Sequence, residues 1–236
     1  MRAHGVQALL MGGQACVLFG AAEFSRDADF AVLADPDNLH RLQAALDELQ
    51  AEVIAVPPFE LRHLERGHAV HFRCKHPEAA ALRVDVMSRL RGVDPFPALW
   101  DRRTTWDLGP AGEIDTLSLP DLVSSKKTQR DKDWPMLRRL VEVSYDADFG
   151  SPTAPRVEFW LRELRTPELL AECAVRFSAA AAAHRRPAAR AAGSGLEAIR
   201  DALQEEERRE RDLDRAYWTP LKAELEAMRH GRLRPG

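Results

Sequence analysis

The sequence predicts an α+β fold, in which a mixed β-sheet with flanking helices is followed by a helical C-terminal region. Three observations favour it. Short apolar runs alternate with amphipathic stretches in the first half. After residue 118 the apolar spacing is almost entirely helical. Residues 149–155 are rich in Gly, Pro, Ser and Thr, so we place a soft boundary there and expect domains at 1–148 and 149–236.

Five runs read as strands because they are short and apolar or alternate in polarity. The first stops at Gly12-Gly13, and the second places Asp27 and Asp29 on one face. The predicted strands cover residues 6–11, 27–33, 52–56, 69–74 and 81–87.

Helices are predicted from spacing and from their start signals. Asp35 before Pro36 suits an N-cap, and Ser118 suits the start of a capped helix. The predicted helices cover residues 14–22, 36–49, 119 onward, 133–143, 157–164, 167 onward and 196–229. We expect a mobile connection at the Ala-, Arg- and Gly-rich residues 179–195, and a break in the last helix near Pro220.

Composition is that of an ordinary globular protein. The formal net charge is −3, which gives no overall basic field for nucleic acid. No charged-then-apolar leader and no apolar run of membrane-spanning length are seen. The three cysteines are scattered, which argues against a disulfide framework or a zinc knuckle. We therefore expect a cytoplasmic protein with no membrane partner.

Three carboxylates and a glycine pair carry the chemistry. Gly12-Gly13 ends a strand and opens a helix, a geometry that lets backbone amides approach a phosphate. Asp27 and Asp29 project from the next strand, and Asp85 lies in an apolar strand, where Asp is unusual.

A divalent metal explains such a convergence. Two carboxylates about 4 Å apart repel by roughly 4 kcal/mol at an effective dielectric near 20. Mg²⁺, or Mn²⁺ in its place, removes this repulsion and also suits substrate phosphates. We expect Asp27, Asp29 and Asp85 to be both the metal ligands and the catalytic residues, with Asp85 helping to deprotonate an acceptor hydroxyl.

The string Met11-Gly12-Gly13, a gap of 13 residues and then Asp27-Ala28-Asp29-Phe30 resembles the signature of the DNA polymerase β nucleotidyltransferase superfamily, and Asp85 matches its third carboxylate. Residues 20–27 look like the phosphate-binding stretch of its small bacterial, toxin-type members. There a basic residue usually stands two before Ser25, where this chain has Glu23, so Arg26 is the expected substitute. The resemblance covers roughly residues 5–145.

Toxin-type relatives carry a basic helical segment after the sheet, and residues 119–133 are similar. Lys126 shares the inward stripe of Leu122 and Val123, and Arg130 lies one turn further. We expect Lys126, Lys127 and Arg130 to neutralise a nucleoside triphosphate. Gly12, Gly13, Ser25 and Arg26 complete the predicted nucleotide site.

The resemblance implies transfer of a nucleoside monophosphate from an NTP to tRNA or a partner protein, as in a toxin–antitoxin component. It further implies a cognate antitoxin or a second copy bound through the C-terminal helices. One alternative is an antibiotic-modifying nucleotidyltransferase. Another is a non-catalytic nucleotide-sensing or partner-binding module of the same fold, and the third is a structural interaction protein that binds no metal.

Several of these residues also have an ordinary structural interpretation. Gly12-Gly13 alone is often just a turn, and a basic run is often a solvated helix end. The His and Cys residues between 68 and 76 match no common zinc spacing, so we interpret them as edge-strand side chains. Residues 205–214 read as an exposed helix face laced with ion pairs.

Overall fold

A computed structural model of the chain describes residues 1–232 and confirms the α+β class. The chain forms two compact units. The first comprises Met1–Ser125 together with the chain from Ala216 onward, and the second comprises Lys126–Arg215. The boundary predicted at 148/149 lies inside the second unit, between two of its helices.

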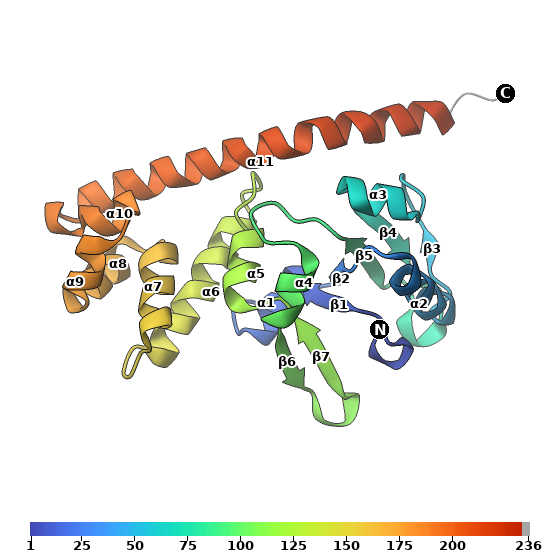
Figure 1. Cartoon of the computed structure of the whole chain (residues 1–236), viewed down its shortest axis with the longest axis horizontal. Coiled ribbons are helices and arrows are strands. Elements are labelled where there is room, and N and C mark those ends of the chain that lie inside the picture. Colours follow the sequence, from blue (N-terminus) through green and yellow to red (C-terminus); the bar gives the residue numbers. More distant parts are fainter. Residues whose placement is uncertain (233–236) are drawn as a thin grey trace. The chain divides into compact units, whose positions relative to one another are not determined.

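A seven-stranded mixed sheet forms the centre of the first unit, with the strand order β3-β4-β5-β2-β1-β7-β6 (Figure 1). β2 is parallel to β5 and β1 is parallel to β7, while the other neighbouring pairs are antiparallel. The strands are β1 (Ala8–Met11), β2 (Asp27–Val32), β3 (Glu52–Val53), β4 (Val70–Arg73), β5 (Arg83–Met87), β6 (Thr104–Asp107) and β7 (Glu113–Thr116).

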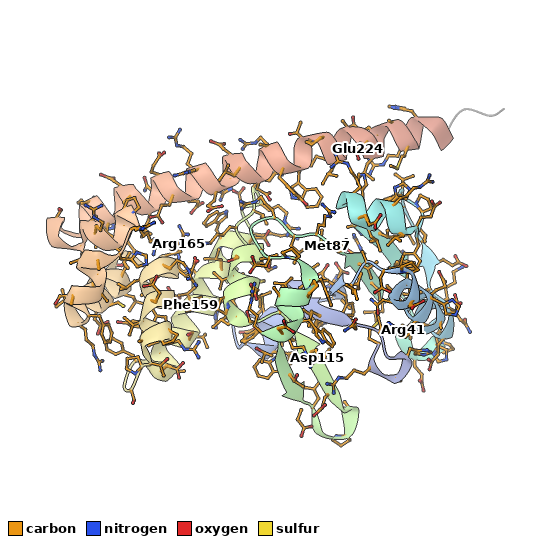
Figure 2. The ribbon with its side chains drawn as sticks, in the orientation of Figure 1. Arg41, Met87, Asp115, Phe159, Arg165 and Glu224 are labelled. Carbon is orange, nitrogen blue, oxygen red and sulfur yellow. The ribbon has the colours of Figure 1, made fainter. Side chains whose placement is uncertain are left out.

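All five predicted strands are present, although β3 is only two residues long. The hairpin of β6 and β7 was not predicted. Its half-exposed, Thr- and Asp-containing strands lack a clear apolar pattern. Contacts distant in sequence define it instead: Trp106 Nε1 donates to Thr116 Oγ1 at 3.1 Å, and buried Asp115 accepts from Thr105 Oγ1 at 2.5 Å (Figure 2).

Two helices of the first unit begin where the sequence signals them, whereas the first helix begins at Gly12 and the helices Leu61–Arg66 and Phe96–Asp101 were not predicted. The Asp35 side chain accepts from the amide of Asn38 at 2.9 Å, and Ser118 Oγ accepts from the amide of Asp121 at 3.3 Å. Both predicted caps are confirmed. The helices are α1 (Gly12–Leu18), α2 (Pro36–Glu48), α3 (Leu61–Arg66), α4 (Phe96–Asp101) and α5 (Leu119–Ser125), with 3₁₀ turns η1 (Arg2–His4), η2 (Pro77–Ala79) and η3 (Gly109–Ala111).

The second unit is entirely helical in its secondary structure, and Trp160 and Leu161 are fully buried in its core. Its elements are α6 (Asp133–Asp148), α7 (Ala154–Glu163), α8 (Pro167–Arg176), α9 (Ser178–Ala183), α10 (Pro187–Arg190), η4 (Ala191–Ser194) and the first part of α11 (Leu196–Arg232).

Two predictions here were wrong. Residues 179–195 are not a mobile connection, because they form short helices that bury Ala181, Ala188 and Ala189. Pro220 does not break the last helix: α11 continues through it, with Pro220 exposed and Leu221 buried beside it. Within residues 1–232, no helix is both long and apolar enough to cross a membrane.

Candidate functional site

The junction of β1 and α1 supports the two catalytic candidates on β2. Gly12 has a φ of +67°, which glycine adopts without strain. A Cβ on Gly12 would lie 2.6 Å from Asp29 Cγ, and a Cβ on Gly13 would lie 2.8 Å from Ser25 Cβ. The glycine pair therefore allows the segment that carries Ser25 and Asp29 to approach the backbone closely.

Strand register brings the three predicted carboxylates onto one face of the sheet. Asp29 on β2 pairs with Asp85 on the neighbouring parallel strand β5, and Asp27 precedes Asp29 by one pleat. The three side chains are half-buried, and Asp29 is packed against Gly12. The Asp27 carboxylate makes no hydrogen bond with any other residue among 1–232.

Asp85 is held by two cationic or ionisable neighbours on the same face. Arg83 binds it through two hydrogen bonds, Nε to Oδ1 at 2.8 Å and Nη2 to Oδ2 at 2.9 Å. His71 on β4 stands opposite Asp85, with Nδ1 2.9 Å from Oδ1. A bidentate Arg–carboxylate pair is both strong and directional.

This arrangement sets the charge state of the site. Burial would raise the pKa of Asp85, but the hydrogen bonds from His71 and Arg83 lower it below its ordinary value. The pKa of Arg83 is raised, mainly by its hydrogen bond to Asp85, with further attraction from Asp27 and Asp29. Both groups are therefore charged at neutral pH.

Arg83 and His71 were not predicted as site residues. The signal for Arg83 lies in the strand period, because residues 83 and 85 must share a face. His71 was interpreted as an edge-strand side chain, because its position opposite Asp85 depends on the pairing of β4 with β5, which the sequence does not specify.

The donor set suits a hard divalent cation in part. Asp27 and Asp29 offer adjacent carboxylate oxygens, the ligands that Mg²⁺ and Mn²⁺ prefer. Asp85 is committed to Arg83 and His71 instead. Accordingly, no three His, Cys, Asp or Glu side chains in the described part of the chain are gathered so that they hold a metal ion as they stand.

The link between α1 and β2 adds exposed groups next to the carboxylates. Ser25 lies against Gly13, and its carbonyl accepts from Gln14 Nε2 at 2.7 Å. Arg26 is exposed, and so is Phe24, with 71% of its surface accessible.

The predicted triphosphate-binding cations belong to the second unit and are paired within it. Lys126 is buried, as its stripe predicted, and its Nζ lies 3.5 Å from Asp133 Oδ1. Arg130 Nε donates to Asp133 Oδ2 at 2.6 Å, and Lys127 Nζ lies 2.8 Å from Glu163 Oε2. Burial would raise the pKa of Asp133. The positive charge of Lys126 and the hydrogen bonds that Thr128 and Arg130 donate to Asp133 instead lower this pKa. The phosphate-binding role of these residues stays a prediction.

Histidines 68, 71 and 76 do not come together. His68 is buried and its Nε2 lies 2.8 Å from Glu224 on α11 (Figure 2), whereas His71 faces Asp85. His76 accepts from the amide of Glu78 at 3.3 Å. The residues therefore form no common metal site, but their interpretation as edge-strand side chains is wrong for His71, because β4 lies between β3 and β5 in the sheet.

Comparison with known proteins adds no family. Neither the protein-family models nor the curated proteins include a match to this sequence.

Proposed function

We propose that the chain is a divalent-metal-dependent nucleotidyltransferase, which moves a nucleoside monophosphate from an NTP to an acceptor hydroxyl and releases pyrophosphate. One observation carries the proposal. Asp27, Asp29 and Asp85 share one face of neighbouring strands, directly beside a glycine of positive φ that is packed against Asp29. This geometry supports the proposal, because the carboxylates of the motif that resembles the polymerase β superfamily lie on one face.

The reaction exchanges one bond for another at the α-phosphorus. The acceptor oxygen bonds to that phosphorus, the bond to the bridging oxygen of pyrophosphate breaks, and the hydroxyl proton passes to a base. Bound Mg²⁺ or Mn²⁺ would neutralise charge on the phosphates and acidify the hydroxyl. Asp27 and Asp29 are the residues that hold it, while Gly12 and Gly13 keep the backbone close to the site.

Asp85 is the proposed base, and Arg83 controls its strength. While Arg83 holds Asp85, the lowered pKa makes this carboxylate a poor proton acceptor. Substrate phosphates compete with Asp85 for the guanidinium, because Arg binds phosphate and carboxylate oxygens in the same bidentate way. Release of Arg83 toward the triphosphate then frees Asp85 for the acceptor hydroxyl.

Acceptor identity follows only from the resemblance. It favours tRNA or a partner protein, with an antibiotic hydroxyl as the small-molecule alternative. Lys126, Lys127 and Arg130 remain the proposed triphosphate ligands, and in this role each must leave a carboxylate partner in its own unit.

The ion pair between Arg83 and Asp85 favours a second candidate function. A non-catalytic nucleotide-sensing module has no need of a free third carboxylate, and Asp85 is already neutralised by Arg83. This module would bind an NTP in a metal-dependent manner and transfer nothing.

Transfer of label from each α-³²P-NTP in the presence of Mg²⁺, into RNA, protein and small-molecule fractions, tests the proposal. The Asp27→Asn, Asp29→Asn double variant runs beside wild type, and Asp101→Asn, an exposed carboxylate at the end of α4, is the matched control. Label that depends on Asp27 and Asp29 but not on Asp101 supports transfer and identifies the acceptor class. Metal-dependent NTP binding without transfer to any fraction supports the sensing module, and absence of both sinks the two proposals together.

A further inference from the structure

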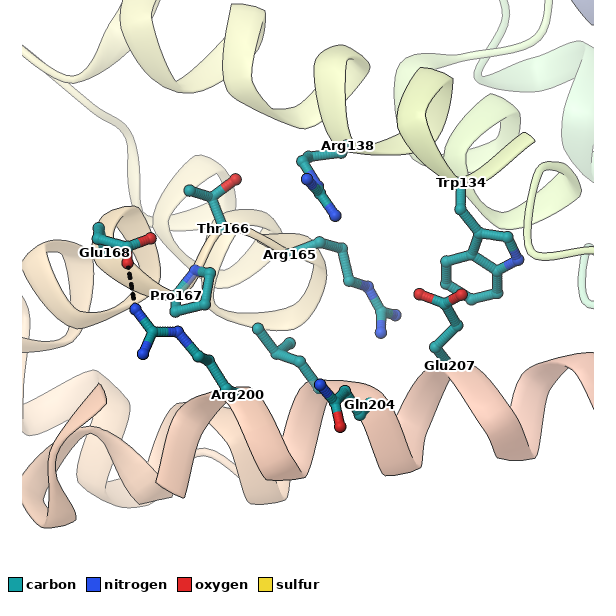
Figure 3. A pocket seen from close by; sticks show the side chains of 10 residues that line it. Trp134, Arg138, Arg165, Thr166, Pro167, Glu168, Arg200, Gln204 and Glu207 are labelled. Atoms are coloured by element: carbon teal, nitrogen blue, oxygen red, sulfur yellow. Dashed lines mark hydrogen bonds and ion pairs between the residues drawn. The ribbon is translucent and has the colours of Figure 1, made fainter. Parts of the chain in front are cut away.

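A separate pocket lies wholly within the second unit. It has a volume of about 260 Å³ and is lined by side chains from α6, the α7–α8 link, the start of α8 and α11. Figure 3 shows Arg138 from α6 and Arg165 from the link extending into this space, with Trp134 and Glu207 at one end. None of the residues predicted for the nucleotide site lines it.

Arg165 is a buried cation with an unused donor. Its side chain is only 8% exposed, and Nη1 lies 3.1 Å from Glu206 Oε2. Its Nε is fully buried and has no hydrogen-bond partner among the described residues. A buried N–H group normally has an acceptor, and none of the described residues supplies one for this donor.

Trp134 does not offer a stacking surface. The guanidinium carbon of Arg165 lies 5.6 Å from the centre of its ring, and that of Arg211 lies 5.4 Å away. The Trp134 residue is 5% exposed, so these contacts and the core cover its ring. A ligand of this pocket is therefore recognised by its charge and hydrogen bonds, not by an aromatic ring.

The lining of the pocket carries three arginines, Arg138, Arg165 and Arg200, against two glutamates, Glu168 and Glu207. Arg200 lies 2.9 Å from Glu168 (Figure 3) and also pairs with Glu197, and Glu207 lies 2.8 Å from Arg211, which also pairs with Asp131. Arg138 is exposed and has no partner in residues 1–232.

Several cations crowd together behind Arg165. Glu163 and Glu206 are shared among Lys127, Arg162, Arg165 and Arg186. Burial, followed by repulsion from Arg165, lowers the pKa of Arg186 to about 10, which is consistent with crowded positive charge.

We propose that this pocket binds a phosphate group, with Arg138 and Arg165 as its principal donors. The two guanidinium groups enter from different elements, and a tetrahedral phosphate presents oxygens in several directions, whereas a carboxylate presents only two in one plane. The volume suits inorganic phosphate, a small phosphate monoester or the terminal phosphate of an oligonucleotide.

Calorimetric titration of the full chain in EDTA tests the site without any contribution from metal. The probes are inorganic phosphate, ribose 5-phosphate, and a short RNA with either a 5′-phosphate or a 5′-hydroxyl. Arg138→Met is the test variant, and Arg139→Met is the matched control, because Arg139 is also exposed and unpartnered but does not line the pocket.

We expect a phosphate-bearing probe to bind wild type and the Arg139 variant alike, and to bind the Arg138 variant about tenfold more weakly or worse. Tightest binding of ribose 5-phosphate identifies a small ester as the ligand, and tightest binding of the 5′-phosphorylated RNA identifies a nucleic-acid end. The proposal is overturned if no probe binds, if Arg138→Met has no effect, or if both RNAs bind equally and neither small phosphate binds. Retained helical circular dichroism in the Arg138 variant separates lost binding from lost folding.

Discussion

Replacing Gly12 by alanine tests whether this glycine is needed for its backbone or for its contact with Asp29. Gly12 has a φ of +67°, so alanine pays a backbone penalty of about 1–2 kcal/mol there. The new Cβ would also stand 2.6 Å from Asp29 Cγ, although carbon atoms prefer about 3.5–4.0 Å. The Asp29 side chain must therefore move by about 1 Å, at a further cost of about 1–3 kcal/mol.

Gly109 provides the matched control. Its φ is +63°, and a Cβ added there meets no atom within 4 Å. Gly109→Ala should therefore show the backbone penalty alone, about 1–2 kcal/mol. We expect Gly12→Ala to lower the free energy of unfolding by about 2–5 kcal/mol, the sum of both terms.

Urea unfolding followed by circular dichroism measures the two losses, and Mn²⁺ binding followed by electron paramagnetic resonance measures the effect on the carboxylates. Under the proposed function, Gly12→Ala also weakens Mn²⁺ binding because it displaces Asp29, while Gly109→Ala leaves binding unchanged. Equal destabilisation by the two substitutions would refute the packing argument. Normal Mn²⁺ binding by a folded Gly12→Ala protein would refute the link between this glycine and the metal site.

Three further predictions concern the ion pair, a helix cap and the core. The pKa of Asp85 is lowered in the folded state, so its ion pair with Arg83 stabilises the protein above pH values near the unfolded pKa of about 3.9, and this stabilisation is lost as the pH falls through the folded pKa. Arg83→Met should therefore lower the free energy of unfolding at pH 7 and change it little at a pH below the folded pKa. An equal loss at both pH values would contradict this prediction. Asp35→Ala removes the acceptor for the Asn38 amide and should cost about 1 kcal/mol by urea unfolding, so an unchanged midpoint would show that the cap is dispensable. Trp160→Ala empties a fully buried site in the second unit and should cost about 3–5 kcal/mol, measured as a shift in the thermal midpoint, with a shift no larger than that of a surface variant as the contrary result.

Local patterns predicted the parts of the fold that local interactions decide. The helix start at Asp35 needs only an acceptor three residues before an amide, and the strand at Asp27–Val32 needs only alternation. The β6–β7 hairpin was missed because its stability comes from partners such as Trp106 and Thr116, which meet only after the strands pair. The prediction at Pro220 was wrong for the opposite reason. The helix-breaking tendency of proline is a local rule, whereas α11 continues through Pro220 with the neighbouring Leu221 buried.

The same division holds at the candidate site. The positions of Asp27, Asp29 and Asp85 on one face follow from strand periodicity and from the resemblance. That Asp85 is already paired follows from neither, because His71 reaches it through the β4–β5 register and Arg83 reaches it through a side-chain conformation.

Arg83 also explains how a face with three carboxylates folds before any cation binds. Without a counter-charge, each close pair would cost several kcal/mol, roughly 4 at 4 Å and an effective dielectric near 20. Arg83 is attracted to Asp85, Asp27 and Asp29 alike, so the chain carries an internal cation at this face. A divalent ion held by Asp27 and Asp29 meets the repulsion of Arg83, which is attracted to the same two carboxylates. Metal affinity should then be modest for the protein alone and greater when triphosphate draws Arg83 away, which makes binding of metal and nucleotide mutually reinforcing.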